Sequence, residues 1–126
     1  MAYPGDNRKI SFIRSVGFAL QGILTSFRER NIIIHYIAAV VAVVAGVFFS
    51  ISSIEWLFVI TSIAGVIVLE MVNTAIEKVV DLITSDYHIL AEKAKDLAAG
   101  AVLIYAIYSM VVGVIIFLPK IYDFIS

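Results

Sequence analysis

Three apolar stretches, each about as long as a bilayer is thick, constrain this chain more than any other feature. They cover residues 32–49, 54–72 and 97–118. A helix needs about 20 apolar residues to cross the hydrocarbon layer, and a helix satisfies all of its own backbone hydrogen bonds there. The 126-residue chain is 62% hydrophobic, against about 45–50% in soluble domains. We therefore predict an all-α integral membrane protein in which residues 1–126 form a single membrane domain.

The segment before the first span, residues 11–28, has a different pattern. Its apolar residues Ile13, Val16, Leu20 and Ile23 recur at helical spacing, with polar residues between them. That pattern predicts an amphipathic helix lying on the membrane surface. The alternative is a core helix of a soluble domain, but the chain offers almost nothing soluble for it to pack against.

The basic residues indicate how the spans are oriented. The turn between the first two spans, residues 50–53, has no basic residue, whereas the regions on the other side of the spans have several. The positive-inside rule therefore places the N-terminus in the cytoplasm and the C-terminus outside. The basic residues concerned are Arg8, Lys9, Arg14, Arg28 and Arg30 before the first span, and Lys78, Lys93 and Lys95 between the second and third.

A stripe of polar residues leaves the second span toward the cytoplasm. Glu70, Asn73, Glu77 and Asp81 are spaced i, i+3, i+7 and i+11, so they share one face of a helix. A carboxylate within a membrane is unfavourable by about 2.5–3.5 kcal/mol at the centre of a span, which makes Glu70 a functional candidate. Carboxylates near basic residues suit Mg²⁺ that is bound partly by nucleotide phosphates.

Several classes of function are excluded or weakened by what the chain lacks. It has no cysteine, so a disulfide framework, a thiolate nucleophile and a cysteine metal site are excluded. A net charge of −1 gives no reason to expect nucleic acid as a partner. Neither a Walker A sequence nor a protein-kinase glycine loop is present.

The acidic stripe belongs to a longer motif that resembles a known family. The run Glu70-x-x-Asn73-Thr74-Ala75-Ile76-Glu77-x-x-x-Asp81 is similar to the signature of the prokaryotic diacylglycerol kinases, and so are Asp86-Tyr87-His88, Ala94-Lys95-Asp96 and Ala98-Ala99-Gly100-Ala101-Val102. The chain most resembles the Gram-positive branch, which phosphorylates undecaprenol in preference to diacylglycerol. That likeness is carried by Glu29-Arg30-Asn31-x-x-x-His35, Ile54-Glu55-Trp56 and Phe117-Leu118-Pro119-Lys120.

The resemblance implies a homotrimeric lipid kinase in the bacterial cell (inner) membrane, with a surface helix and three transmembrane helices. Such an enzyme uses ATP and Mg²⁺, and its N-terminus and active site are cytoplasmic. The implied reaction converts undecaprenol to undecaprenyl phosphate. The alternative is phosphorylation of diacylglycerol to phosphatidic acid. Whether each active site is shared between protomers stays open.

The resemblance also implies roles for individual residues. Glu70 would be the general base on the lipid hydroxyl, and Glu29 and Glu77 would hold Mg²⁺ with the ATP phosphates. Substrate binding would involve Glu70, Asn73 and Ala99. The nucleotide, with its metal, would be bound by Glu29, Glu77, Asp86, Tyr87, His88, Lys95 and Asp96.

Other interpretations of the same residues are possible. The acids could form the pathway of an ion or proton transporter, but the outer halves of the spans are almost entirely apolar. The chain could also be a non-catalytic assembly partner. Glu29 could be a surface ion pair, and Lys95 could pair with Glu92 at i, i+3. His88 could be a plain interfacial histidine, and His35 could simply snorkel at the entrance of the first span.

Overall fold

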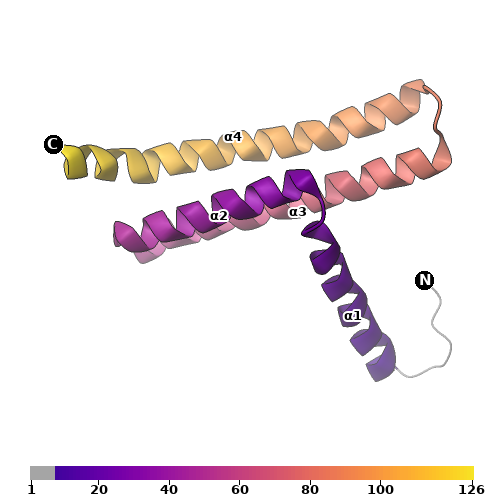
Figure 1. Ribbon diagram of the computed structural model, residues 1–126, viewed down its shortest axis with the longest axis horizontal. Helices are drawn as coiled ribbons and strands as arrows, with labels where there is room; N and C mark the ends of the chain where they lie inside the picture. The colour runs from indigo at the N-terminus through magenta and orange to yellow at the C-terminus, as the bar shows by residue number, and fades with distance from the viewer. Residues whose placement is uncertain (1–7) are drawn as a thin grey trace.

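The computed structural model describes residues 8–126 and consists there of four helices. They are α1 (Arg8–Ser26), α2 (Arg30–Phe48), α3 (Ser53–Ile83) and α4 (Ile89–Ile125). Figure 1 shows α2, α3 and α4 running alongside one another, while α1 leaves the bundle at a steep angle. By length and composition α2, α3 and α4 can each cross a membrane. The predicted all-α membrane architecture with three spans is therefore confirmed.

The third and fourth helices are longer than the spans they contain. α3 has 31 residues and α4 has 37. At 1.5 Å per residue α3 measures roughly 45 Å, whereas the hydrocarbon layer is about 30 Å thick. The predicted spans 54–72 and 97–118 lie within these helices. Most of the surplus, residues 73–83 of α3 and 89–96 of α4, projects from one side of the bundle and carries most of the charged residues of these two helices.

A tight turn joins α2 to α3 at the other end of the bundle. Ser50 adopts a positive φ of 50°, and the helix start that follows is closed by a capping box. In this box Ser52 Oγ accepts from the backbone N–H of Glu55, and Glu55 Oε1 accepts from the N–H of Ser52. Lys120 of α4 donates to the same Glu55 carboxylate at 3.0 Å. The capping box therefore fixes the start of α3, and the ion pair between Lys120 and Glu55 joins that start to α4.

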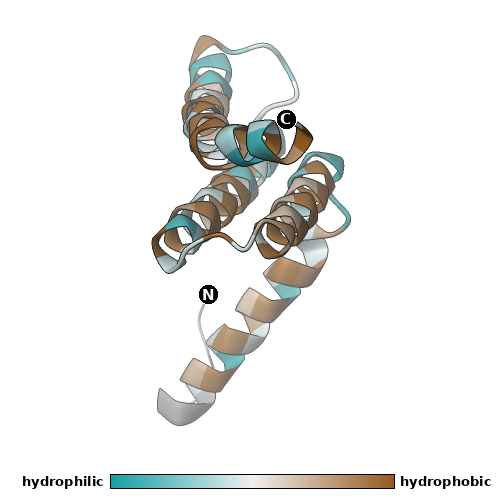
Figure 2. Ribbon diagram, turned by 90° about the vertical axis from the view of Figure 1, so that its left-hand side faces the viewer, coloured by the Kyte–Doolittle hydropathy of each residue, from teal (hydrophilic) through white to brown (hydrophobic). Residues whose placement is uncertain are grey.

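The core of the bundle lies near this turn. Its buried cluster consists of Ile51, Val59, Val112 and Ile116. Farther along, the ring of Tyr105 on α4 lies directly against Gly65 of α3, and its hydroxyl donates to the carbonyl of Thr61 at 3.0 Å. Many of the remaining apolar side chains are exposed, and Figure 2 shows that hydrophobic residues occur along all four helices. Lipid or further protein is expected to cover them.

Helix α1 contacts the bundle mainly through its last turn. Ser26 and Tyr36 hydroxyls lie 2.9 Å apart, and the rings of Phe27 and Tyr36 stack at 4.4 Å. The apolar side chains along the rest of α1, such as Leu20 and Leu24, are exposed. The predicted helix over 11–28 thus exists over 8–26, and its position on the membrane surface stays a prediction.

Candidate functional site

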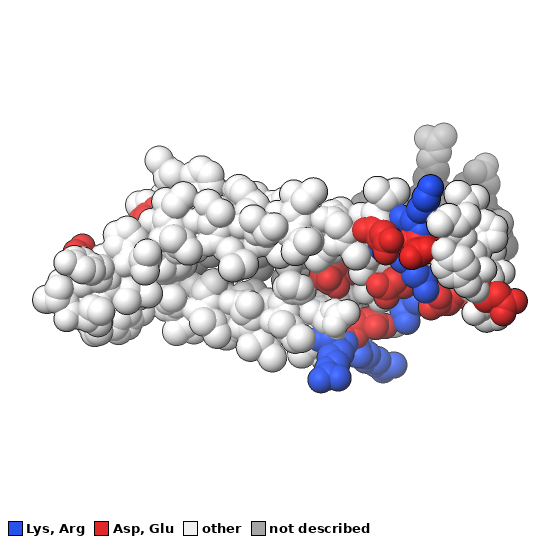
Figure 3. Space-filling view, turned by 90° about the horizontal axis from the view of Figure 1, so that it is seen from above, with Lys and Arg blue, Asp and Glu red and all other residues white. Residues whose placement is uncertain are grey.

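Charged side chains are concentrated at the end of the bundle opposite the capped turn. Figure 3 shows acidic and basic groups crowded over that end and an almost uncharged surface along the rest of the visible face. The acidic stripe of α3 runs into this region. Along it, Glu70 and Asn73 are buried, Glu77 is half-buried and Asp81 is exposed. The stripe therefore passes from the packed bundle to the polar end along one helix.

Glu70 and Asn73 are the buried polar groups at the centre of the candidate site. They are only 7% and 5% exposed. The amide of Asn73 donates to Glu77 Oε1 at 3.2 Å. Glu70 Oε2 and Asn73 Oδ1 are buried without a hydrogen-bond partner. Since nearly all buried polar atoms in proteins are paired, these two oxygens are suited to meet a ligand.

An ion pair lies where α1 meets α2 and α3. Glu29 precedes α2 and contacts Lys78 of α3 at 3.0 Å. Both residues line a hollow of about 280 Å³, together with Gly22, Thr25, Ser26, Ile32, Met71, Thr74 and Ala75. Lys78 directly follows Glu77 in the chain, so the structure brings Glu29 to the same part of α3 as the second predicted metal ligand.

The oxygen atoms of Glu29, Asn73 and Glu77 are the candidate ligands for the predicted Mg²⁺. Within residues 8–126, no three acidic or histidine side chains gather into a closed metal site. Mg²⁺ in nucleotide sites uses one or two carboxylates and completes its shell with phosphate and water oxygens. Glu77, the unpaired Asn73 Oδ1 beside it and Glu29 are oxygen donors of that kind. The donor chemistry therefore fits Mg²⁺ bound together with a nucleotide.

Five of the seven predicted nucleotide-binding residues come together in a hollow of about 320 Å³ between the end of α3 and the start of α4, whereas Glu29 and Glu77 do not line it. Asp86, Tyr87, His88, Lys95 and Asp96 all line it. Lys95 donates to Asp81 at 2.6 Å, so its partner is on α3 and the alternative pairing with Glu92 is wrong. Glu92 instead accepts from the Tyr87 hydroxyl at 2.7 Å, which raises the pKa of that phenol.

Two further predicted residues take other places at this end. His88 is the residue before α4, and its Nδ1 accepts from the N–H of Leu90 at 3.1 Å, so the ring closes the helix start. Ala99 is exposed on α4, one turn beyond Lys95, and does not line the 320 Å³ hollow. Its predicted contact with substrate therefore requires a ligand that extends along α4.

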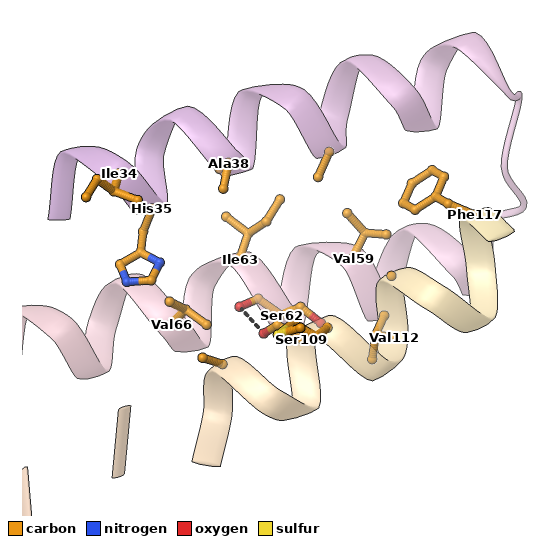
Figure 4. Close-up of a pocket in the computed structure, with 15 residues that line it drawn as sticks. Ile34, His35, Ala38, Val59, Ser62, Ile63, Val66, Ser109, Val112 and Phe117 are labelled. Atoms are coloured by element: carbon orange, nitrogen blue, oxygen red, sulfur yellow. Dashed lines mark hydrogen bonds between the residues drawn. The ribbon is translucent and has the colours of Figure 1, made fainter. Parts of the chain in front are cut away.

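An apolar groove runs between α2, α3 and α4 and ends at His35. Figure 4 shows the side chains of the three helices around it, with the His35 ring at one end and Phe117 at the other. Its volume is about 430 Å³. The Ser109 hydroxyl within it is satisfied by carbonyl oxygens of Tyr105 and Ser62. At the mouth, His35 Nε2 lies 4.0 Å from Glu70 Oε1.

Comparison with known proteins identifies the family. The family model described as prokaryotic diacylglycerol kinase matches residues 17–117. This chain belongs to the prokaryotic diacylglycerol kinase family. It is similar to an undecaprenol kinase of Bacillus subtilis, with 46% identity over 110 residues that cover 86% of this chain and 89% of the relative. It is also similar to a diacylglycerol kinase of Escherichia coli K12, with 32% identity over 79% of this chain and 82% of the relative.

A third relative agrees with these two. A diacylglycerol kinase of Haemophilus influenzae is 33% identical over 83% of this chain and 91% of its own length. The family and these relatives identify the chain as a multi-pass membrane protein and a lipid kinase that transfers a phosphoryl group from ATP. The expected resemblance to this family is therefore confirmed.

Two contacts of the site were not predicted from sequence. The position of His35 at the entrance of the first span predicts a side chain that snorkels, yet its ring lies next to Glu70. Lys78 was counted only among the charges that orient the spans, yet it contacts Glu29. Both contacts join residues that are far apart in the sequence, and no periodic pattern along the chain reveals them.

Proposed function

We propose that this lipid kinase phosphorylates undecaprenol at the cytoplasmic face of the bacterial membrane, working as a homotrimer with α1 on the membrane surface. One observation carries the proposal: Glu70 is buried, with one carboxylate oxygen unpartnered, at the inner end of an apolar span. A long-chain alcohol dissolved in the bilayer would present its hydroxyl at this depth. ATP would approach from the cytoplasm, at the charged end of the bundle into which the same acidic stripe runs.

The proposed chemistry assigns the proton to Glu70. As the lipid O–H bond breaks, its proton moves to a Glu70 carboxylate oxygen. The lipid oxygen forms a bond to the γ-phosphorus while the bond from that phosphorus to the bridging oxygen of ADP breaks. ADP leaves with that electron pair, and the lipid phosphate forms. Such a transfer depends mainly on positioning and charge neutralisation.

The other predicted residues would bind and orient the nucleotide. Glu29 and Glu77 would hold Mg²⁺, which when bound neutralises charge on the ATP phosphates. Asn73, already in contact with Glu77, would keep that carboxylate in place. Lys95 would exchange its contact with Asp81 for the transferred phosphoryl group. Asp86, Tyr87, His88 and Asp96 line the hollow in which the rest of the nucleotide would fit.

The choice of undecaprenol rests on similarity to the Bacillus subtilis relative, which matches over more of this chain and at higher identity than the two diacylglycerol kinases described above. Diacylglycerol is the second candidate because those relatives are named for it. Purified protein given radiolabelled ATP, Mg²⁺ and equal amounts of both lipids should label undecaprenol preferentially. Preferential labelling of diacylglycerol would overturn the choice of substrate.

Replacement of the proposed base gives the sharpest test of the mechanism. Glu70→Gln keeps the size and the amide can still occupy the buried position, but it cannot accept the proton. We expect turnover to be abolished while oligomer assembly and nucleotide binding are retained, measured by size-exclusion chromatography and by titration with a fluorescent ATP analogue. Near-normal turnover in Glu70→Gln would remove this residue from the mechanism.

A further inference from the structure

His35 lies at the boundary between the apolar groove and the acidic stripe. It is in the second turn of α2, and its side chain is 27% exposed. Figure 4 shows its ring directed from α2 toward α3, at the end of the groove. On one side the ring adjoins the apolar lining contributed by Ile34, Ala38 and Val66. On the other side it faces the buried carboxylate of Glu70.

The distance between the His35 imidazole and the Glu70 carboxylate leaves room for one bridging oxygen atom. His35 Nε2 and Glu70 Oε1 are 4.0 Å apart, which is too long for a direct hydrogen bond. One oxygen atom placed between them could lie about 2.8 Å from both, which is an ordinary hydrogen-bond length. An alcohol oxygen suits this place because it can donate its proton to the carboxylate and accept the N–H of the imidazole.

The groove explains which alcohol could reach this position. The space between the two groups lies at the end of a groove of about 430 Å³ whose walls are almost wholly apolar. A hydrocarbon chain lying in the groove would have its terminal hydroxyl at the mouth, beside His35.

We infer that His35 is a substrate-positioning residue, which donates from Nε2 to the oxygen of the lipid hydroxyl while Glu70 accepts the proton of that hydroxyl. The inference rests on the proposed function and names the group that orients the acceptor. The imidazole keeps its own proton throughout the transfer. Its contribution is to aim a lone pair of the hydroxyl oxygen toward the phosphoryl group.

The test compares four variants of the full-length protein in detergent micelles, with undecaprenol and ATP–Mg²⁺ as substrates. His35→Leu removes the donor, and we expect kcat/KM for the lipid to fall about ten-fold, the loss associated with one hydrogen bond, with the KM for ATP unchanged. His35→Gln should restore most of the activity because its amide nitrogen reaches the position of Nε2. His35→Asn is too short to reach it and should behave like His35→Leu.

The fourth variant, Tyr36→Phe, is the matched control. Tyr36 is the next residue on α2, and its hydroxyl contacts Ser26 rather than Glu70, so this variant should keep the lipid KM of the unmodified protein. If His35→Leu does not assemble, the comparison of His35→Gln with His35→Asn still decides. Equal activity of these two, or a rise in the KM for ATP with every His35 variant, would overturn the inference. Inactivity of the unmodified protein on both lipid alcohols would instead overturn the proposed function.

Discussion

At the scale of single residues, Gly65 controls how closely α3 and α4 approach. A Cβ atom built at Gly65 would overlap the ring of Tyr105, which is held in place by its hydrogen bond to Thr61. Alanine is the better helix former by about 1 kcal/mol, but overpacking of this kind is unfavourable by about 1–3 kcal/mol. We therefore predict that Gly65→Ala lowers the thermal stability of the detergent-solubilised protein, measured by thermal unfolding.

The control for this prediction is Gly113→Ala on α4, because a Cβ atom there would meet nothing within 4 Å apart from the backbone of its own helix and the adjoining residues. We expect that variant to unfold at the same or a slightly higher temperature. The loss from Gly65→Ala should also shrink in a Tyr105→Leu background, since the two positions are in contact and their effects should not add. An undiminished loss in that background would show that the ring of Tyr105 is not the cause.

The residues of the candidate site divide into those that spacing could predict and those that it could not. Helical periodicity alone places Glu70, Asn73 and Glu77 on one face, and the structure joins two of them directly by a hydrogen bond. The contacts His35–Glu70 and Lys95–Asp81 depend on how separate helices are rotated against each other. Rotation is set by packing around residues such as Gly65, which hydropathy does not reveal.

At the scale of the helix, the start of α3 is a separate stability element, far from the acids at its other end. Ser52 and Glu55 satisfy each other's backbone N–H groups in a capping box. Replacing such a cap by alanine lowers stability by about 0.5–2 kcal/mol. We predict that Ser52→Ala lowers the unfolding temperature while kcat and both KM values stay unchanged, because the lipid kinase site lies at the opposite end of the helix.

Ser53→Ala is the matched control for the cap. Ser53 is the next residue and the first of α3, and its side chain takes no part in the capping box. We expect it to unfold like the unmodified protein. Equal loss of stability in Ser52→Ala and Ser53→Ala would contradict the role given to the cap, and a drop in kcat with Ser52→Ala would contradict the independence of the two helix ends.

The lengths of the helices show where prediction from hydropathy stops. Hydropathy detects only the apolar part of a helix, so it predicted spans of membrane length within α3 and α4. The structure continues both helices through the charged region, where α3 ends at Ile83 and α4 starts at Ile89. The start of α3 does have a sequence signal, Ser-x-x-Glu at 52–55. The start of α4, closed by the imidazole of His88, has no comparable signal.

At the scale of the whole molecule, the predicted site residues of a single chain do not line one common hollow. The hollow lined by Asp86, Lys95 and Asp96 includes neither Glu70 nor Glu77. The buried core of the single chain is small, and long apolar surfaces on all its helices remain exposed. Both observations are compatible with the proposed homotrimer, in which neighbouring copies would cover part of these surfaces. They also suggest that the acids of one protomer work with the nucleotide hollow of the next.

Mixing two inactive variants tests this division of the site. We predict that Glu70→Gln and Asp96→Asn are each inactive alone, because one lacks the base and the other a nucleotide contact. In trimers assembled at random from equal amounts, a shared site combines an intact Glu70 with a neighbour's intact Asp96 in about one quarter of cases. Lipid phosphorylation should therefore recover to about one quarter of the activity of the unmodified protein. A mixture that stays inactive, although chromatography and cross-linking show mixed trimers, would place each site within a single chain.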